Sequence, residues 1–398
     1  MHSIPIHVRM ATCSAMRDIF VLIKMFGLGI NVSSVLLRDI VVGKVWLLNF
    51  VVLLVCGAGC LEAEKTPVVQ TGGNGGRVDS AAGRIDYLQK ENPPALRSVT
   101  KWENEYGPGI KLVTEHYEIF TTFLEPLMLR QLPGFMESAY RAYNGQLPEA
   151  IETKAKFTIY VFAERKQWED FTEGFAGRNA VILKKIKAGA YCMNGSCVVY
   201  NIGREQTLSV LGHEGWHQFN SRHFKFRLPS WLNEGIAMLF EASRYDKGLF
   251  YFEPGRNLRR LGALRKTLID DRMMPLQELM GLNPGEVLAT KETEDVTAFY
   301  GQSYALVRFL REEEFGKRLG NYQQLLLGSV EGTWPLGPVA AKIAADRNIP
   351  MSTRWNRVVG PKLFEHYVSD DFDQIEREYL AFCKKIVYRI RLKKAAHE

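Results

Sequence analysis

Residues Leu208–Phe219, LSVLGHEGWHQF, decide how the rest of the chain is interpreted, because they place His213, Glu214 and His217 in the spacing His-Glu-x-x-His. Residues four apart lie on one face of an α-helix, so the two imidazoles can hold one metal ion. Zinc takes nitrogen and oxygen donors in tetrahedral array, and a catalytic zinc leaves its fourth position for water. Glu214 lies about 100° around the helix from His213 and can act on that water as a base. The motif predicts a Zn²⁺ site.

Two downstream residues compete for the third position on the metal. Glu234 follows His217 by seventeen residues within Leu228–Glu241, LPSWLNEGIAMLFE, which is typical of a short helix opened by its proline. A helix, a turn and a second helix can return that carboxylate to the metal. His223 follows His217 by six residues, as in the longer motif HExxHxxGxxH, but Asn220 stands where that motif has its turn glycine. We expect Glu234 as the ligand and keep His223 as the alternative.

The stretches HEGWHQF and WLNEGIA together resemble the corresponding stretches of the gluzincin metallopeptidases, of the aminopeptidase-N-like kind. The segment TEHYEIFTT, which precedes them, resembles the opening of a bacterial, peptidase-MA-like branch of exported proteins and lipoproteins. The resemblance implies that His213, His217 and Glu234 bind zinc and that Glu214 is the general base. It implies a hydrolase acting on peptide bonds. Glu241 is a candidate hydrogen-bond partner for a ligating histidine.

The fold implied by this resemblance is α+β and zincin-like. It has a small mixed sheet with an edge strand over the HExxH helix, followed by a mostly helical C-terminal lobe. In such enzymes the edge strand binds the substrate backbone, and residues 189–191 take that place here. This strand carries no acid to grip a free amino terminus, which favours an endopeptidase. In AFYGQSYALVRFL, residues 298–310, the match implies that Tyr300 stabilises the oxyanion, with Tyr304 as the fallback.

Hydrophobic periodicity indicates one folded domain over residues 96–390, with a sheet lobe over about 96–222 and a helical lobe over about 228–390. In the first lobe we expect strands at 111–122, at 156–162 and within 178–203, and a helix at 124–144. In the second lobe, apolar residues recur at helical spacing over 257–268, 295–314, 317–327, 339–345 and 371–388.

Cys192 and Cys197 flank the turn MNGS within GAYCMNGSCVVYN. Across a hairpin their Cβ atoms could meet, so we consider both a disulfide and a pair of buried thiols. With these two paired, Cys383 has no partner.

We expect residues 1–60 to form a leader, with a mis-set start site as the alternative for residues 1–43. Lys44 precedes the apolar run VWLLNFVVLLVCGAGC. The run is too short for a full membrane span and is typical of a signal-peptide core. The small residues before Cys60 resemble a lipoprotein cleavage box, so a lipidated Cys60, a plain signal peptide and an uncleaved anchor are the alternatives. All three predict export to the periplasm or cell surface. Residues 61–95, which include TGGNGG, are typical of a flexible tether.

Composition favours a globular protein, with 46% hydrophobic and 24% charged residues. The net charge of +7 falls to +4 without residues 1–60, which carry five basic and two acidic side chains. This mild charge gives no reason to expect a nucleic-acid partner. Three functions remain: an exported zinc metallopeptidase, a degenerate relative acting as a surface binding or scaffold protein, and a zinc amidase acting on cell-wall peptide. Glu214 counts against the scaffold, because a structural zinc site needs no base.

Overall fold

The computed structural model describes residues 80–186, 189–285, 287, 293–348 and 353–390. All of them belong to the unit Val45–Glu398. The predicted leader, with its alternatives at Cys60, and the first part of the predicted tether lie outside the described residues. Among the helices of the described ranges, none has the length and apolar character needed to cross a membrane.

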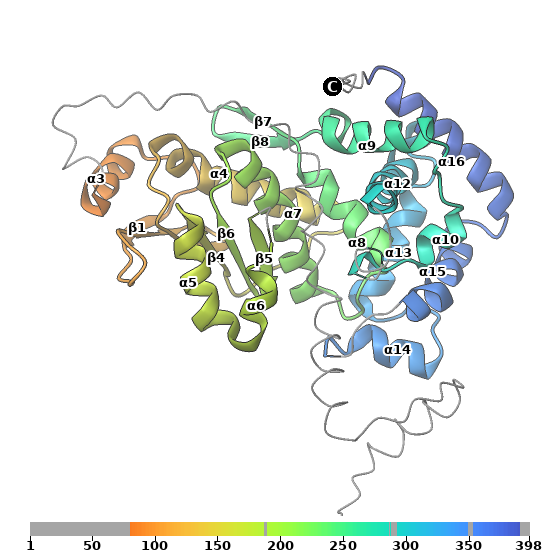
Figure 1. Ribbon diagram of the computed structural model, residues 1–398, viewed down its shortest axis with the longest axis horizontal. Helices are drawn as coiled ribbons and strands as arrows, with labels where there is room; N and C mark the ends of the chain where they lie inside the picture. The colour runs from red at the N-terminus through yellow and green to blue at the C-terminus, as the bar shows by residue number, and fades with distance from the viewer. Residues whose placement is uncertain (1–79, 187–188, 286, 288–292, 349–352, 391–398) are drawn as a thin grey trace, which may run out of the picture. The chain divides into compact units, whose positions relative to one another are not determined.

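A six-stranded mixed sheet, in the order β1-β2-β3-β4-β6-β5, occupies the N-terminal part of the described chain (Figure 1). Its strands are β1 (Ser98–Lys101), β2 (Ile110–Val113), β3 (Tyr117–Thr121), β4 (Phe157–Phe162), β5 (Ala190–Met193) and β6 (Ser196–Tyr200). Strands β3, β4 and β6 run parallel, and the outer pairs are antiparallel. Strand β5 pairs only with β6 among the described strands, so it is an edge strand, as expected.

Helices cover both faces of the central strands, which explains why β4 and β6 are apolar on both sides. On one face, Val199 packs in the core that contains α4 (Pro126–Asn144) and α7 (Arg204–His223). On the other face, Val198 packs in a separate cluster with α5 (Arg165–Ala176) and α6 (Ala180–Leu183). The HExxH helix α7 therefore lies directly on the sheet.

Helix α7 lies between the sheet and the helices that follow it (Figure 1). Its start is set by Gly203, whose φ of 97° is readily available only to glycine. Its close approach to α4 needs small residues as well, because a Cβ at Gly215 would collide with the Tyr143 hydroxyl. Tyr143 donates a hydrogen bond to the carbonyl of Gly212 at 2.7 Å and so locks the two helices together.

The C-terminal part is helical, as expected. After α8 (Ser230–Ala237) and the hairpin of β7 (Ser243–Asp246) and β8 (Leu249–Phe252), the helices are α9 (Leu258–Ile269), α10 (Leu276–Gly281), α12 (Thr293–Glu312), α13 (Leu319–Glu331), α14 (Pro338–Ala345), α15 (Thr353–Tyr367) and α16 (Phe372–Val387). Helix α12 is buried along most of its length and packs against α8 and α9. These elements confirm the α+β class with a helical C-terminal lobe.

Two expectations, one for the sheet lobe and one for the tether before it, were wrong in detail. Residues 111–122 form two antiparallel strands and not one, because the buried carboxylate of Glu137 binds Thr114 Oγ1 at 2.6 Å and the backbone N–H of His116 at 2.8 Å. These bonds hold the turn between β2 and β3. The tether predicted over 61–95 ends early, since α3 (Ala81–Glu91) is a helix whose Leu88 is fully buried.

Candidate metal centre

His213 and His217 lie one turn apart on α7, and Glu234 of α8 lies opposite them. The Glu234 carboxylate oxygens are 3.5 Å from Nε2 of His213 and 3.6 Å from Nε2 of His217. Two donors that each lie about 2.1 Å from one tetrahedral ion are about 3.4 Å apart, so these separations suit a single shared cation. Ligand atoms of His213, Glu214 and His217 also lie within 4.8 Å of one another. The fold thus brings together all four residues predicted for the metal and its base.

Two atoms at the centre of this cluster are buried without a hydrogen bond. They are Nε2 of His213 and Oε2 of Glu234, which form no hydrogen bond among the described residues and face each other as an ion pair at 3.5 Å. Leaving a buried donor or acceptor unsatisfied is costly. A cation bound between them would satisfy both, so the donor set fits a divalent metal ion.

The remaining ring nitrogens are each held by a side-chain oxygen. Nδ1 of His213 lies 2.9 Å from Glu241, as the sequence predicted, and Nδ1 of His217 lies 3.2 Å from Oδ1 of Asn233. Arg260 in turn donates to both Glu241 oxygens, at 2.6 and 2.8 Å. A partner on Nδ1 orients a histidine and leaves Nε2 to bind a metal.

Asn233 was not identified from the sequence. Its Oδ1 also accepts from Nε1 of Trp216 at 3.2 Å and from Nδ2 of Asn220 at 2.7 Å. The available clue was its position next to Glu234 on a short helix. Asparagines next to a candidate ligand are common, so the sequence alone does not predict that Asn233 binds His217. That contact depends on the orientation of α8 relative to α7.

Burial and charge shift the pKa values of Glu214, His217 and His213 in different directions. Burial raises the pKa of Glu214 to about 7, even though His213 favours its ionised form. Burial also lowers the pKa of His217 to about 4, which keeps its ring neutral at pH 7. Burial would lower the pKa of His213 too, but the carboxylates of Glu234 and Glu241 raise it to about 10. The two carboxylates beside His213 therefore favour a positive charge there, and Glu214 is the buried acid next to it.

The two tyrosine candidates differ in their surroundings. Tyr300 is buried on α12, and its ring packs under the guanidinium of Arg260, 5.3 Å from the ring centre. Arg260 holds Glu241 and Glu241 holds His213, so two residues lie between Tyr300 and the cluster. The hydroxyl of the fallback residue, Tyr304, donates to the backbone carbonyl of Pro254 and is engaged in holding the fold.

The alternative ligand His223 is engaged elsewhere. Its Nε2 lies 2.8 Å from Oγ1 of Thr153, and its ring packs against Phe219 and Phe157. Glu234, and not His223, faces the two histidines of the motif.

Cys192 and Cys197 form a disulfide across the β5–β6 hairpin, which decides between the two alternatives left open by the sequence. Among the described cysteines, Cys383 is a free, buried thiol. The β5 edge lies against α7, and both disulfide sulfurs contact the carbonyl oxygen of Glu214. The strand expected to bind substrate therefore runs beside the proposed base.

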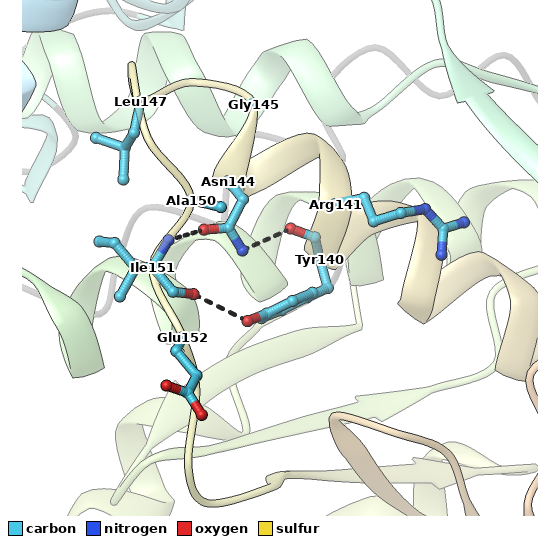
Figure 2. Close-up of a pocket in the computed structure, with 8 residues that line it drawn as sticks. All are labelled: Tyr140, Arg141, Asn144, Gly145, Leu147, Ala150, Ile151 and Glu152. Atoms are coloured by element: carbon cyan, nitrogen blue, oxygen red, sulfur yellow. Dashed lines mark hydrogen bonds between the residues drawn. The ribbon is translucent and has the colours of Figure 1, made fainter.

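A hollow at the C-terminal end of α4 lies apart from this cluster (Figure 2). Its eight lining residues include none of the motif residues. Asn144 accepts the backbone N–H of Ile151, and Tyr140 donates to the Ile151 carbonyl, as Figure 2 shows. Because these bonds hold the loop in place, the polar groups are used by the fold and offer little to a ligand.

No protein-family model matches this chain, and no curated protein matches it in sequence.

Proposed function

We propose that the protein is a zinc-dependent metallopeptidase with a zincin-like, gluzincin type of fold, acting on internal peptide bonds. The observation that carries the proposal is the position of the Glu234 carboxylate between Nε2 of His213 and Nε2 of His217. Three converging donors with a separate, unligated acid are the arrangement of a catalytic zinc site. A structural site has four protein ligands.

His213, His217 and Glu234 would hold the ion. When bound, zinc would polarise the scissile carbonyl and make a water molecule acidic near neutral pH. Glu214 takes a proton from the attacking water and passes it to the leaving nitrogen as the carbon–nitrogen bond breaks. Its carboxyl is buried beside His213 and His217, where it can reach a water held at the cluster. Tyr300 donates a hydrogen bond to the carbonyl oxygen as charge develops there. No covalent bond between enzyme and substrate is needed.

Strand β5 supports the choice of a peptide as substrate. No described strand pairs with its outer edge, and Cys192 and Met193 are partly exposed, so an extended chain could pair there as a further strand. It runs Ala190-Tyr191-Cys192-Met193 and contains no acid to select a free amino terminus. This supports cleavage within a chain.

We further propose that the protein acts outside the cytoplasm. The leader predicted over residues 1–60 supports export, with lipidation at Cys60 as one form of anchoring. The Cys192–Cys197 disulfide supports the same location, because such bonds form and persist in oxidising compartments. A peptide or protein outside the cytoplasm is then the substrate.

Metal analysis combined with a peptide-library assay tests the proposal. We expect one zinc per chain in the wild type and in Glu214→Gln, with cleavage only by the wild type. His223→Gln serves as the matched control, since it alters a histidine of the same helix and should keep both zinc and cleavage. Zinc retained with no cleavage by any variant would favour the scaffold alternative, and cleavage of wall peptide alone would favour the amidase.

A further inference from the structure

The Cys192–Cys197 disulfide packs against the turn of α7 that carries Glu214. The two cysteines are directly opposite each other on β5 and β6, with their Cα atoms 4.3 Å apart. Their sulfur atoms lie 3.1 and 3.5 Å from the backbone carbonyl oxygen of Glu214. The disulfide thus joins β5 to β6 and also contacts the turn of α7 that carries Glu214.

The opposite side of this turn has no free space. A Cβ at Gly212 would collide with the carbonyl of Phe240, and a Cβ at Gly215 would collide with Tyr143. Tyr143 also donates its hydroxyl hydrogen to the Gly212 carbonyl. Since interiors are close-packed, α7 cannot move away from the sheet to absorb a change at the disulfide.

A role in global stability does not account well for this bond. It joins residues only five positions apart, and the backbone pairing of β5 with β6 already closes the same loop. The stabilisation from restricting an unfolded chain is smallest for such short loops. The main consequence of the bond is therefore local.

We propose that the disulfide is a positioning element of the peptidase site, which sets the gap between the β5 edge and the Glu214 turn. This inference depends on the proposed function, in which the substrate pairs with β5. Reduction breaks the covalent link, and two thiol sulfur atoms then need van der Waals separation, so the pair spreads apart. Cys197 is fully buried and α7 is held by α4, so Cys192 and the edge strand take up the displacement.

Reduction needs a dithiol as the electron donor. One of its thiolates attacks a cystine sulfur to give a mixed disulfide, and its second thiolate closes the reagent into a cyclic disulfide. The two electrons and two protons that the reagent loses end on Cys192 and Cys197 as thiols.

The experiment compares the oxidised and dithiol-reduced full chain, with the state of Cys192 and Cys197 checked by peptide mass spectrometry. We measure kcat and KM on a fluorogenic peptide, the zinc content, and hydrogen exchange of residues 190–193. Misplacing a substrate by about 1 Å can cost up to about a hundredfold, so we expect KM to rise at least about tenfold on reduction. The zinc content should stay constant, exchange should increase in β5 and not in α7, and reoxidation should restore the kinetics.

Two variants control for other effects of the reagent. The double variant Cys192→Ala, Cys197→Ala should have the KM of reduced wild type, with or without the dithiol. If the dithiol lowers the activity of this variant, the reagent is removing zinc. Cys383→Ala, which removes the buried thiol of α16, should respond like wild type.

Unchanged kinetics and unchanged exchange in the reduced protein would overturn the inference. Loss of zinc by the double variant without dithiol, or unfolding on reduction, would overturn it too, because the bond would then hold the fold and not the gap. If the oxidised protein cleaves no peptide, the proposed function fails, and the exchange of β5 alone decides the role of the disulfide.

Discussion

Replacing Glu234 by glutamine gives the most direct test of the metal centre, because the side chain keeps its size and loses its charge. A ligand that binds only the folded state stabilises it by about 4 kcal/mol when present at a thousand times its Kd. For a domain of this size that corresponds to a rise in Tm of about 8 °C, at about 2 °C per kcal/mol. Wild type should show a shift of this order on addition of zinc.

The size of the effect follows from the position of Glu234 between the two histidines. Losing a second-sphere partner costs about 10- to 100-fold in metal affinity, and losing a charged ligand should cost at least about 100-fold. At the same zinc concentration, Glu234→Gln should then gain only about 1.4 kcal/mol, which is about 3 °C in Tm. Comparing each variant with and without zinc removes any difference in stability between the metal-free proteins.

Differential scanning fluorimetry with a zinc titration measures these shifts. His223→Gln is the matched control and should show the full wild-type shift, because its ring nitrogen is engaged by Thr153. A full shift in Glu234→Gln would refute the proposed ligand set. If zinc raises the Tm of Glu234→Gln by the full amount and no longer raises that of His223→Gln, His223 is the third ligand.

Four further predictions concern residues around this site and in the sheet lobe. Glu214→Gln should keep zinc and lose about 10²- to 10⁴-fold in kcat, measured on a fluorogenic peptide, and residual activity near wild type would exclude it as the base. Glu241→Gln should weaken zinc binding about 10- to 100-fold in a chelator competition, and unchanged binding would mean that His213 needs no partner. Tyr300→Phe should lower kcat by roughly 100-fold at constant Tm, whereas Tyr304→Phe should lower Tm and leave kcat unchanged; the reverse result would make Tyr304 the oxyanion donor. Glu137→Gln should destabilise the fold above pH 4.5 and make no difference well below it, which urea unfolding at several pH values would measure, and a pH-independent difference would contradict the reasoning.

The sign of the Glu137 effect follows from its contacts. Burial alone would raise the pKa of this carboxyl, but hydrogen bonds from Thr114 and His116 lower it below its ordinary value of 4.5. A lowered pKa means that the ionised form stabilises the folded state. This stabilisation is complete above the unfolded pKa and is lost as the pH falls through the folded one.

The sequence alone determined the features that depend on local spacing. Any helix over 204–223 puts His213 and His217 on one face with Glu214 beside them, whatever packs around it. Apolar periodicity was likewise enough to locate α4, β4 and α12 within a few residues. These features need only backbone geometry, which each short segment carries with it.

Contacts between distant segments were decided by the tertiary structure. The orientation of α8 on α7 places Glu234, and not His223, opposite the two histidines, and it brings Asn233 to His217, a contact that no spacing predicted. The break between β2 and β3 depends on Glu137, more than twenty residues away, and was missed for that reason. The disulfide beneath Glu214 likewise needed the register of β5 on β6. In each case the deciding interaction joins side chains whose separation is set by packing, which a pattern along the chain does not specify.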